Sequence, residues 1–441
     1  MKIFDFLKPA PHIARLSDTQ IDSSYRKYRI NNFIGIFIGY LSYYLLRGNF
    51  SIAKPFFSSL GLTKSQMGYV SAALFFSYGI SKFIMGNLSD RSNPRYFIVA
   101  GLIISIIINL IFGLATVVAT SLFIMCILMF INGCAQGMGA SPCYRTIAHW
   151  FTANERGRIM SMWNISHNIG FALLSLISIF LINIGWQSMF YIPAIIASIN
   201  VAFMIIMIRD TPQSVGLMPI EEYKNVYPEN SQKGINYEQE LSAKEILFKY
   251  VLVNRYVWYL ALANMFVYFI RHGISDWSTL YLTEIKHLNI TSSFLGSFIY
   301  EIAGAVGMLT CGLISDKLFK GKRAPVSIIS LGIACLGVLL YWRSTHVIVS
   351  YFSLSLIGMF IYGPLMLAGA QILDIIPKKA VGTTMGLLGI FGYWGGTSAA
   401  TIGFGKIIDK FSWNVGFAAL IASGALAITF FSMTISVKDT K

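Results

Sequence analysis

Residues 44–47 read YLLR and residues 268–271 read YFIR, and these two copies of one pattern decide the fold. Each copy lies within a long apolar segment, and the copies are 224 residues apart. A second pattern repeats in the same order at nearly the same offset, as GNLSDR at residues 86–91 and GLISDK at residues 312–317. Two ordered repeats are hard to obtain by chance. They predict two similar halves with a binding site between them.

The composition around these repeats predicts an all-α membrane protein. Of 441 residues, 55% are hydrophobic and 12% are charged, whereas a soluble protein carries about 25% charged residues. A block of about 20 apolar residues spans a bilayer as a helix, and a dozen such blocks exclude a soluble helical core. The twelve predicted transmembrane helices are 32–57, 66–88, 96–117, 120–142, 158–184, 188–208, 251–274, 292–314, 325–342, 347–373, 380–404 and 412–436.

Basic residues are distributed unevenly between these blocks, and their distribution predicts the topology. Lys and Arg gather in alternate connections, at residues 91–95, 156–158, 317–323 and 378–379. Because cytoplasmic connections carry the excess of basic residues, both termini are predicted to be cytoplasmic. The predicted organisation is an N-terminal six-helix bundle at 1–208, a polar cytoplasmic linker at 209–250, and a C-terminal six-helix bundle at 251–441, with a pseudo-two-fold axis relating the bundles.

The formal net charge of +15 would suit a nucleic-acid-binding protein, but its alternate placement indicates a lipid bilayer as the partner and no nucleic acid. The chain has no HExxH, GxSxG or Walker A motif, so we expect a transporter and not an enzyme. We expect no cofactor, metal or disulfide, because no CxxC pair exists and all cysteines lie in apolar blocks. They are Cys126, Cys134, Cys143, Cys311 and Cys335.

Among the ionisable residues inside the predicted spans, we select Arg47, Lys82, His167, Arg271 and Glu301 as candidates. Such residues are costly in a bilayer and mark functional sites by default. At 1.5 Å per residue, Arg47 lies about 22 Å from Asn32 and Arg271 about 24 Å from Arg255, so the pseudo-two-fold axis makes the two arginines face each other. Two guanidinium groups match the oxygens of a tetrahedral oxyanion. We therefore predict a phosphate-like ligand.

Each of these residues also has a purely structural interpretation. Either arginine could snorkel to the membrane surface, and Lys82 could form a fixed pair with a carboxylate. His167 is either a pH-sensitive donor to the ligand or a neutral histidine bonded within the bundle. For Glu301 we expect an ion pair with Arg271 or Arg47 when no substrate is bound.

Polar and aromatic side chains follow the charges at helical spacing and complete the predicted substrate site. They are Tyr40, Tyr44, Tyr78, Trp163, Asn164, Tyr268, Tyr362 and Tyr393.

The Asp residues of the second repeat are predicted to have a conformational role. Asp90, followed by Arg91, and Asp316 each lie at a predicted helix C-terminus, where negative charge is unfavourable. We expect basic partners from a neighbouring helix or loop, in pairs that break and reform between conformations. A static loop ion pair is the alternative.

The loop GNLSDRSNPR at 86–95 resembles the organophosphate:phosphate antiporter family of the major facilitator superfamily. Residues 6–16 (FLKPAPHIARL) and 209–225 (RDTPQSVGLMPIEEYKN) resemble the members that transport glycerol 3-phosphate. The resemblance implies a major facilitator fold, in a bacterial inner membrane, that exchanges glycerol 3-phosphate for inorganic phosphate by alternating access as a monomer. Exchange of a hexose phosphate, or sensing of a sugar phosphate, are the alternatives. The implied substrate contacts are Arg47, Lys82, His167 and Arg271.

Two positions depart from this family's pattern. Relatives usually carry Lys immediately after the first arginine, where this chain has Gly48, although the lysine's possible partner Asp276 remains. We therefore expect the ion pair at the outer gate to be weaker or absent. Relatives often carry Trp where this chain has Ala140, so the cavity is expected to be lined differently there.

Overall fold

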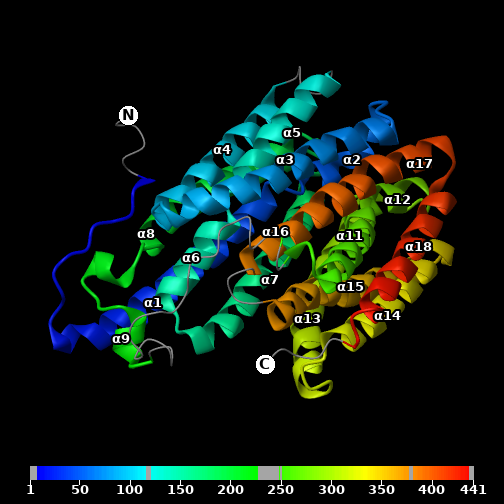
Figure 1. Ribbon diagram of the computed structural model, residues 1–441. Helices are drawn as coiled ribbons and strands as arrows, with labels where there is room; N and C mark the ends of the chain where they lie inside the picture. The colour runs from blue at the N-terminus through cyan, green and yellow to red at the C-terminus, as the bar shows by residue number, and fades with distance from the viewer. Residues whose placement is uncertain (1–6, 116–120, 227–247, 249–250, 377–380, 437–441) are drawn as a thin grey trace.

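The computed structural model describes residues 7–115, 121–226, 248, 251–376 and 381–436. This part of the chain consists of helices and connections and contains no strand (Figure 1). The N-terminal helices are α1 (Asp18–Leu45), α2 (Asn49–Ser59), α3 (Lys64–Asp90), α4 (Pro94–Leu114), α5 (Leu122–Gln136), α6 (Ala140–Trp150), α7 (Ala153–Leu181) and α8 (Ser188–Met207).

Two short helices follow α8, the 3₁₀-helix η3 (Pro212–Val215) and α9 (Ile220–Lys224). The C-terminal helices are α11 (Arg255–Ser275), α12 (Ser278–Glu284), α13 (Ile290–Lys317), α14 (Arg323–Arg343), α15 (Val347–Ile375), α16 (Val381–Ile390), the π-helices η6 (Phe391–Thr397) and η7 (Ala399–Gly403), α17 (Phe404–Lys410) and α18 (Trp413–Ser432).

Each predicted membrane block overlaps helices among the described residues. The first helix of each half ends near its arginine, α1 at Leu45 just before Arg47 and α11 at Ser275 just after Arg271. Eight helices among the described residues are long and apolar enough to cross a membrane. The other four predicted blocks fall on α1–α2, α3, α11 and the segment from α16 through η6 and η7. Three of these carry Arg47, Lys82 or Arg271, which lowers their hydropathy. The count of twelve spans thus stays a prediction.

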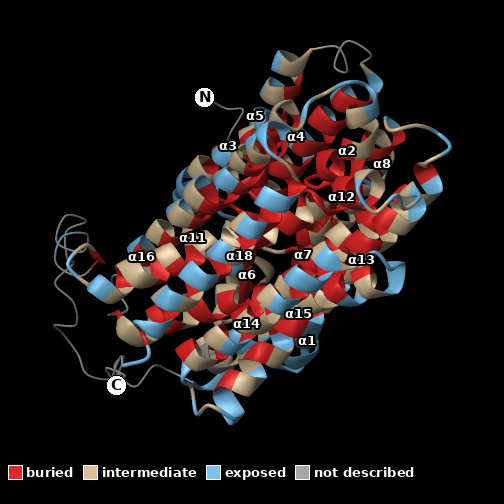
Figure 2. Cartoon of the chain, turned by 90° about the vertical axis from the view of Figure 1, so that its right-hand side faces the viewer, coloured by how far each residue is buried: buried red, intermediate tan, exposed pale blue. Residues whose placement is uncertain are grey.

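The surface of the helices carries the apolar faces that a bilayer requires. Ile103, Ile107 and Ile111 recur at four-residue spacing on α4 and are 41, 49 and 42% exposed. In water such a stripe would be packed against a core, whereas here the exposed residues line the outside of the helices and the buried residues lie between them (Figure 2). Lipid is the environment in which this surface is stable.

The N-terminal and C-terminal helices meet along the middle and at one end. α7 packs against α13, α2 against α12, and α3 against α17. The contacts of α2, α12 and α17 lie at the end of the helices opposite to α9 and the end of α18 (Figure 1). The division of the chain at 209–250 stays a prediction, because most of that segment lies outside the described residues.

The chain before α1 runs along the start of the linker and is bonded to it. Main-chain N–H groups of Ile13 and Leu16 donate to carbonyls of Gln213 and Gly216 at 3.1 and 2.8 Å. The Tyr25 hydroxyl donates to the Met218 carbonyl. Burial raises the pKa of Tyr25 well above its usual value, so this hydroxyl stays protonated and keeps donating.

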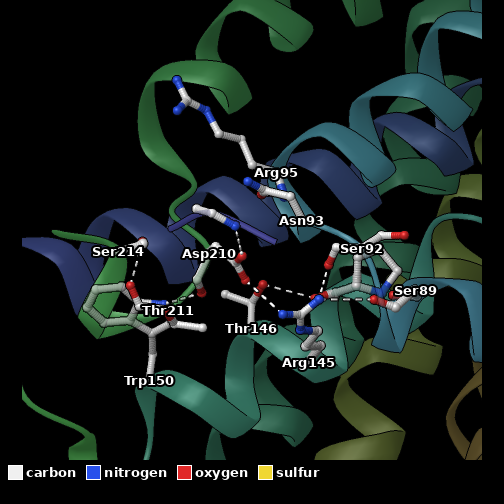
Figure 3. A network of polar contacts seen from close by, with 12 residues as sticks. Ser89, Ser92, Asn93, Arg95, Arg145, Thr146, Trp150, Asp210, Thr211 and Ser214 are labelled. Atoms are coloured by element: carbon white, nitrogen blue, oxygen red, sulfur yellow. Dashed lines mark hydrogen bonds and ion pairs between the residues drawn. The ribbon is translucent and has the colours of Figure 1, made fainter. Parts of the chain in front are cut away.

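Arg145 and Asp210 form the centre of this assembly (Figure 3). The guanidinium of Arg145 lies 3.1 Å from the Asp210 carboxylate and also donates to the carbonyls of Ser89 and Ser92 at the end of α3. The other carboxylate oxygen of Asp210 accepts from the main-chain N–H of Ala10 at 2.8 Å. One buried ion pair therefore connects the N-terminal segment, the loop after α3, α6 and the linker.

We expect Asp210→Ala to lower stability by about 3 kcal/mol, because it leaves the guanidinium of Arg145 mostly buried without its anion. The measurement is the thermal midpoint of the detergent-solubilised protein. Arg15→Ala is the matched control, since it removes the exposed Arg15–Glu222 pair of the same segment and should cost less than about 1 kcal/mol. Equal midpoints for the two variants would contradict the central role of Asp210.

Candidate functional site

A cavity between the N-terminal and C-terminal helices contains both predicted arginines. Arg47 reaches it from the break between α1 and α2, and Arg271 from the last turns of α11. The cavity encloses about 470 Å³, part of it open to solvent. Its other lining residues are Tyr44, Gly48, Ser51, Phe75, Phe171, His272, Ser275, Asp276, Glu301 and Tyr393.

Aromatic rings connect the two arginines by two routes. On the first, the Cζ atom of Arg47 lies 5.2 Å from the ring centroid of Tyr44. That ring lies 5.2 Å from His167, which lies 5.8 Å from Tyr362. The Cζ atom of Arg271 lies 4.5 Å from the Tyr362 ring. The four side chains of this wall come from α1, α7, α15 and α11, so both halves build it.

The second route uses tyrosines only. The Cζ atom of Arg47 lies 4.0 Å from the Tyr78 ring, and Tyr78 packs on Tyr393 at 4.8 Å. Tyr393 packs on Tyr268 at 5.1 Å, whose ring lies 5.9 Å from Arg271. Ring faces attract cations without neutralising them. The predicted tyrosines thus hold both guanidinium groups in place and leave their charge available.

Neither arginine is neutralised by a carboxylate. No described carboxylate forms an ion pair with Arg47 or Arg271, and the buried Nε of Arg271 has no hydrogen-bond partner among the described atoms. Arg47 is only 8% exposed and Arg271 lines the same cavity, so the alternative that these side chains snorkel to the surface is wrong for this conformation. Two like charges in a weakly polar cavity repel each other, and the cavity therefore favours an anion.

Glu301 does not form the ion pair that the sequence predicted. Its carboxylate accepts hydrogen bonds from the Tyr362 hydroxyl at 2.8 and 3.0 Å and from the Asn168 amide at 2.8 Å. The prediction was wrong for this conformation because Tyr362 presents its ring to Arg271 and its hydroxyl to Glu301. The carboxylate is thus satisfied without an arginine.

Lys82 and His167 contact the aromatic rings around the arginines, do not line the cavity themselves, and have no carboxylate partner among the described residues. The ammonium of Lys82 lies 5.8 Å from the Tyr393 ring and forms no ion pair with a described residue, so the alternative of a fixed pair is wrong. The Nδ1 atom of His167 bonds to the carbonyl of Asn164 in its own helix. A carbonyl only accepts, so Nδ1 carries the proton and Nε2 is the other hydrogen-bonding atom of the ring.

Three predicted residues form a layer behind the cavity wall. Tyr40 packs on Trp163 at 4.5 Å, and the Trp163 indole N–H donates to the carbonyl of Ile36 at 3.3 Å. The Asn164 amide lies 3.0 Å from the sulfur of Met308 on α13. None of these three lines the cavity. Their contacts position α1, α7 and α13 relative to one another.

Asp276 has a partner that the sequence analysis missed. Its carboxylate lies 2.5 Å from the ammonium of Lys54 and also accepts from the hydroxyls of Ser51 and Ser71. The side chains of Lys54 and Asp276 are 0 and 1% exposed. The expectation that this pair is weak or absent was therefore wrong. The available signal was the lysine itself, a charge inside the predicted block 32–57.

Gly48 and Lys54 together explain the departure from the family's pattern. The space beside Gly48 is filled by the ring of Phe171, which a side chain at position 48 would strike. Lys54 on α2, six residues after Gly48, supplies the cation instead. Its ammonium also lies 3.7 Å from the ring of Trp277, next to Asp276.

Further contacts join the halves at this same end. The Glu284 carboxylate accepts from the Ser58 hydroxyl at 2.6 Å and lies 3.1 Å from the Lys64 ammonium. Asp409 accepts from the main-chain N–H groups of Lys64 and Ser65 at the start of α3, at 3.1 and 2.7 Å. In the described residues every ion pair between the halves lies at this end. The structure is thus a conformation closed on the side of α2 and α12.

The predicted charge pairs after α3 and α13 have different outcomes. Asp316 has its basic partner, because Arg323 from α14 bonds to it and lies 3.6 Å from Asp374. The side chain of Asp90 lies outside the described side chains, and Arg91 is exposed. After α3, Arg145 bonds the terminal carbonyls, as described above.

Tyr393 owes its position to the π-helix η6. Glycines at 392 and 396 lie against α11, where a Cβ at Gly396 would meet the main chain of Met265 and the side chain of Tyr268. These glycines therefore allow η6 to pack closely on α11. π-helical turns often occur at functional sites, and this one brings the tyrosine between Tyr78 and Tyr268.

Known proteins match this arrangement along nearly the whole chain. The sequence profile of the Major Facilitator Superfamily matches residues 36–400. The chain belongs to the Major Facilitator Superfamily. This membership confirms the predicted fold class and identifies the chain as a membrane transporter rather than an enzyme. It also agrees with the predicted location in a membrane.

Within the Major Facilitator Superfamily, the chain is 49% identical over 436 residues to the "Glycerol-3-phosphate transporter" of Bacillus subtilis, covering 98% of both chains. It is 39% identical over 442 residues to the "Probable hexose phosphate transport protein" of Chlamydia pneumoniae, covering 97% of this chain and 96% of the relative. A solved bacterial homologue of the human lysosomal transporter Spinster matches 92% of this chain and 97% of that chain, with a TM-score of 0.71 and 14% identity. The last likeness shows the fold alone.

We expect Lys54→Gln to open the closed end, because it leaves the buried Asp276 carboxylate without its cation. The probe is Ser275→Cys in a background without the five native cysteines, labelled by a membrane-impermeant thiol reagent from the side of α2 and α12. The variant should be labelled at least tenfold faster than its parent, which corresponds to about 1.4 kcal/mol.

Lys64→Gln is the matched control for this experiment. It removes a pair between the same two halves, but both side chains of that pair are 25% exposed, so the labelling rate should change less than about threefold. A Lys54→Gln variant labelled no faster than its parent would contradict the closing role of the Lys54–Asp276 pair.

Proposed function

We propose that the chain exchanges glycerol 3-phosphate for inorganic phosphate by alternating access, without a cofactor. The observation that carries the proposal is the pair of buried, unneutralised guanidinium groups of Arg47 and Arg271 in one cavity. A guanidinium presents a planar fork of N–H donors that binds phosphate oxygens two at a time. The names of the glycerol-3-phosphate and hexose phosphate relatives support the same class of substrate.

The charge of the cavity supports exchange rather than one-way release. Without an anion, Arg47 and Arg271 repel each other in a weakly polar environment. An anion that bridges them relieves this repulsion and stabilises the approach of the two halves. Return of the empty transporter is then slow, and a second anion has to bind before the halves move back.

The remaining residues have proposed roles around this centre. Lys82 adds a donor, the Nε2 atom of His167 adds one when the ring is protonated and accepts when it is neutral, and the tyrosines hold the guanidinium groups. Glu301 acts as a gate element, since movement of Tyr362 with the bound anion would release its carboxylate. Asp276 closes the cavity on the side of α2 and α12 through its ion pair with Lys54. This pair must break when the cavity opens there.

The location of the transporter completes the proposal. We place it in a bacterial inner membrane with both termini in the cytoplasm, following the distribution of Lys and Arg, and as a functional monomer. The end closed by Lys54 and Asp276 is then the outer end.

We expect Arg47→Lys and Arg271→Lys each to reduce phosphate exchange in proteoliposomes at least tenfold. Lysine keeps the charge but loses the bidentate fork, and hydrogen bonds to charged groups contribute about 1.5–3 kcal/mol. Arg255→Lys, an exposed arginine at the start of α11, is the matched control and should exchange at the normal rate. Normal exchange by both cavity variants would rule out the proposal.

Competition separates the two candidate substrates. We expect glycerol 3-phosphate to inhibit uptake of labelled phosphate at lower concentration than glucose 6-phosphate, because the chain is more similar to the glycerol-3-phosphate relative. The reverse order would make the alternative, hexose-phosphate:phosphate exchange, the function. Binding of either ligand without counterflow of labelled phosphate would instead indicate a sugar-phosphate sensor.

A further inference from the structure

The cavity continues beyond the arginines toward its closed end, and this part has a different chemical character. Ser51 and Ser275 each follow one of the arginines by four residues, and on the continuous helix α11 this places Ser275 about 6 Å beyond Arg271. His272 lies on α11 between Arg271 and Ser275, and Ser51, His272 and Ser275 all line the cavity. The sequence analysis gave none of these residues a role.

His272 is buried without a complete set of hydrogen bonds. It is 7% exposed, and its Nε2 atom has no hydrogen-bond partner among the described residues. Its ring is held between Phe75 at 4.8 Å and Tyr268 at 5.8 Å. An unsatisfied buried polar atom costs about 1–3 kcal/mol, so a histidine kept only for packing would be expected to bond to a neighbour. The ring is fixed in place with a polar atom unused.

Apart from the two arginines, the cavity groups around His272 that are left to bond a ligand are neutral. The Asp276 carboxylate is taken by Lys54, Ser51 and Ser71. The Ser275 hydroxyl lines the cavity and makes no hydrogen bond to a described residue. The guanidinium groups of Arg47 and Arg271 are better partners for phosphate than these neutral groups. A neutral donor and acceptor suit hydroxyl groups instead.

We propose that His272 and Ser275 form a subsite for the hydroxyl-bearing organic part of the phosphate ester. The inference rests on the proposed function and adds the orientation of the substrate. The phosphate lies between Arg47 and Arg271, and the organic part points toward the closed end, where Lys54 and Asp276 join the halves. Recognition of hydroxyl groups there distinguishes an organic phosphate from inorganic phosphate, which does not extend into the subsite.

Two ligands that differ only in hydroxyl groups test the subsite. Glycerol 3-phosphate and propyl phosphate have the same chain length, and each is used to compete with labelled phosphate for uptake into proteoliposomes. The ratio of their inhibition constants should favour glycerol 3-phosphate in the wild type. His272→Phe keeps the ring between Phe75 and Tyr268 but removes its nitrogens, so the ratio should fall roughly tenfold.

Two further variants keep the result interpretable. His272→Gln restores a donor and an acceptor and should recover part of the ratio, whereas His346→Phe, the same change at an exposed histidine, should leave the ratio at the wild-type value. The ratio compares two ligands in one variant and does not depend on the amount of folded protein.

The outcomes separate this inference from the proposed function. A wild type that exchanges phosphate but does not distinguish the two esters would overturn the subsite and leave phosphate exchange standing. An unchanged ratio in His272→Phe would also overturn it. A wild type that exchanges no phosphate at all would overturn the proposed function and this inference with it.

Discussion

The repulsion between two buried guanidinium groups is the constraint on which the rest of the structure depends. Arg47 and Arg271 come from opposite halves of the chain and share one cavity without a carboxylate to neutralise them. A charge costs several kcal/mol in a membrane unless it is compensated. The compensation here is partial, from the faces of tyrosine rings that attract the cations without occupying their N–H donors. The donors are therefore left for a ligand.

The two carboxylates nearest the cavity are satisfied in ways that keep them away from the arginines. Glu301 is bonded by Tyr362 and Asn168, and Asp276 by Lys54 and serines. Had either carboxylate paired with an arginine, an anion would have to displace it. Each instead connects the two halves, so the positive charge of the cavity is separated from the contacts that fix the conformation. Binding and closure can then be changed by different substitutions.

The sequence predicted the fold class and the central charges because both depend on local patterns. Apolar blocks predict helices, and an ordered repeat predicts equivalent positions for Arg47 and Arg271. The partner of Glu301 was not predictable, since Tyr362 is close to it only through the packing of α13 on α15. The burial of His272 was not predictable for the same reason, because its ring packs against Phe75 on another helix.

The replacement of one cation by another shows how packing decides which residue closes the cavity. A lysine at position 48 would need the space that Phe171 fills. The break after Arg47 allows α2 to take its own direction, and Lys54 on that helix reaches Asp276 with a side chain that is fully buried. Salt screens a buried ion pair much less than an exposed one, so the strength of this pair depends mainly on its geometry. The closing contact therefore lies away from Arg47, and the cavity wall between them carries Ser275 and His272.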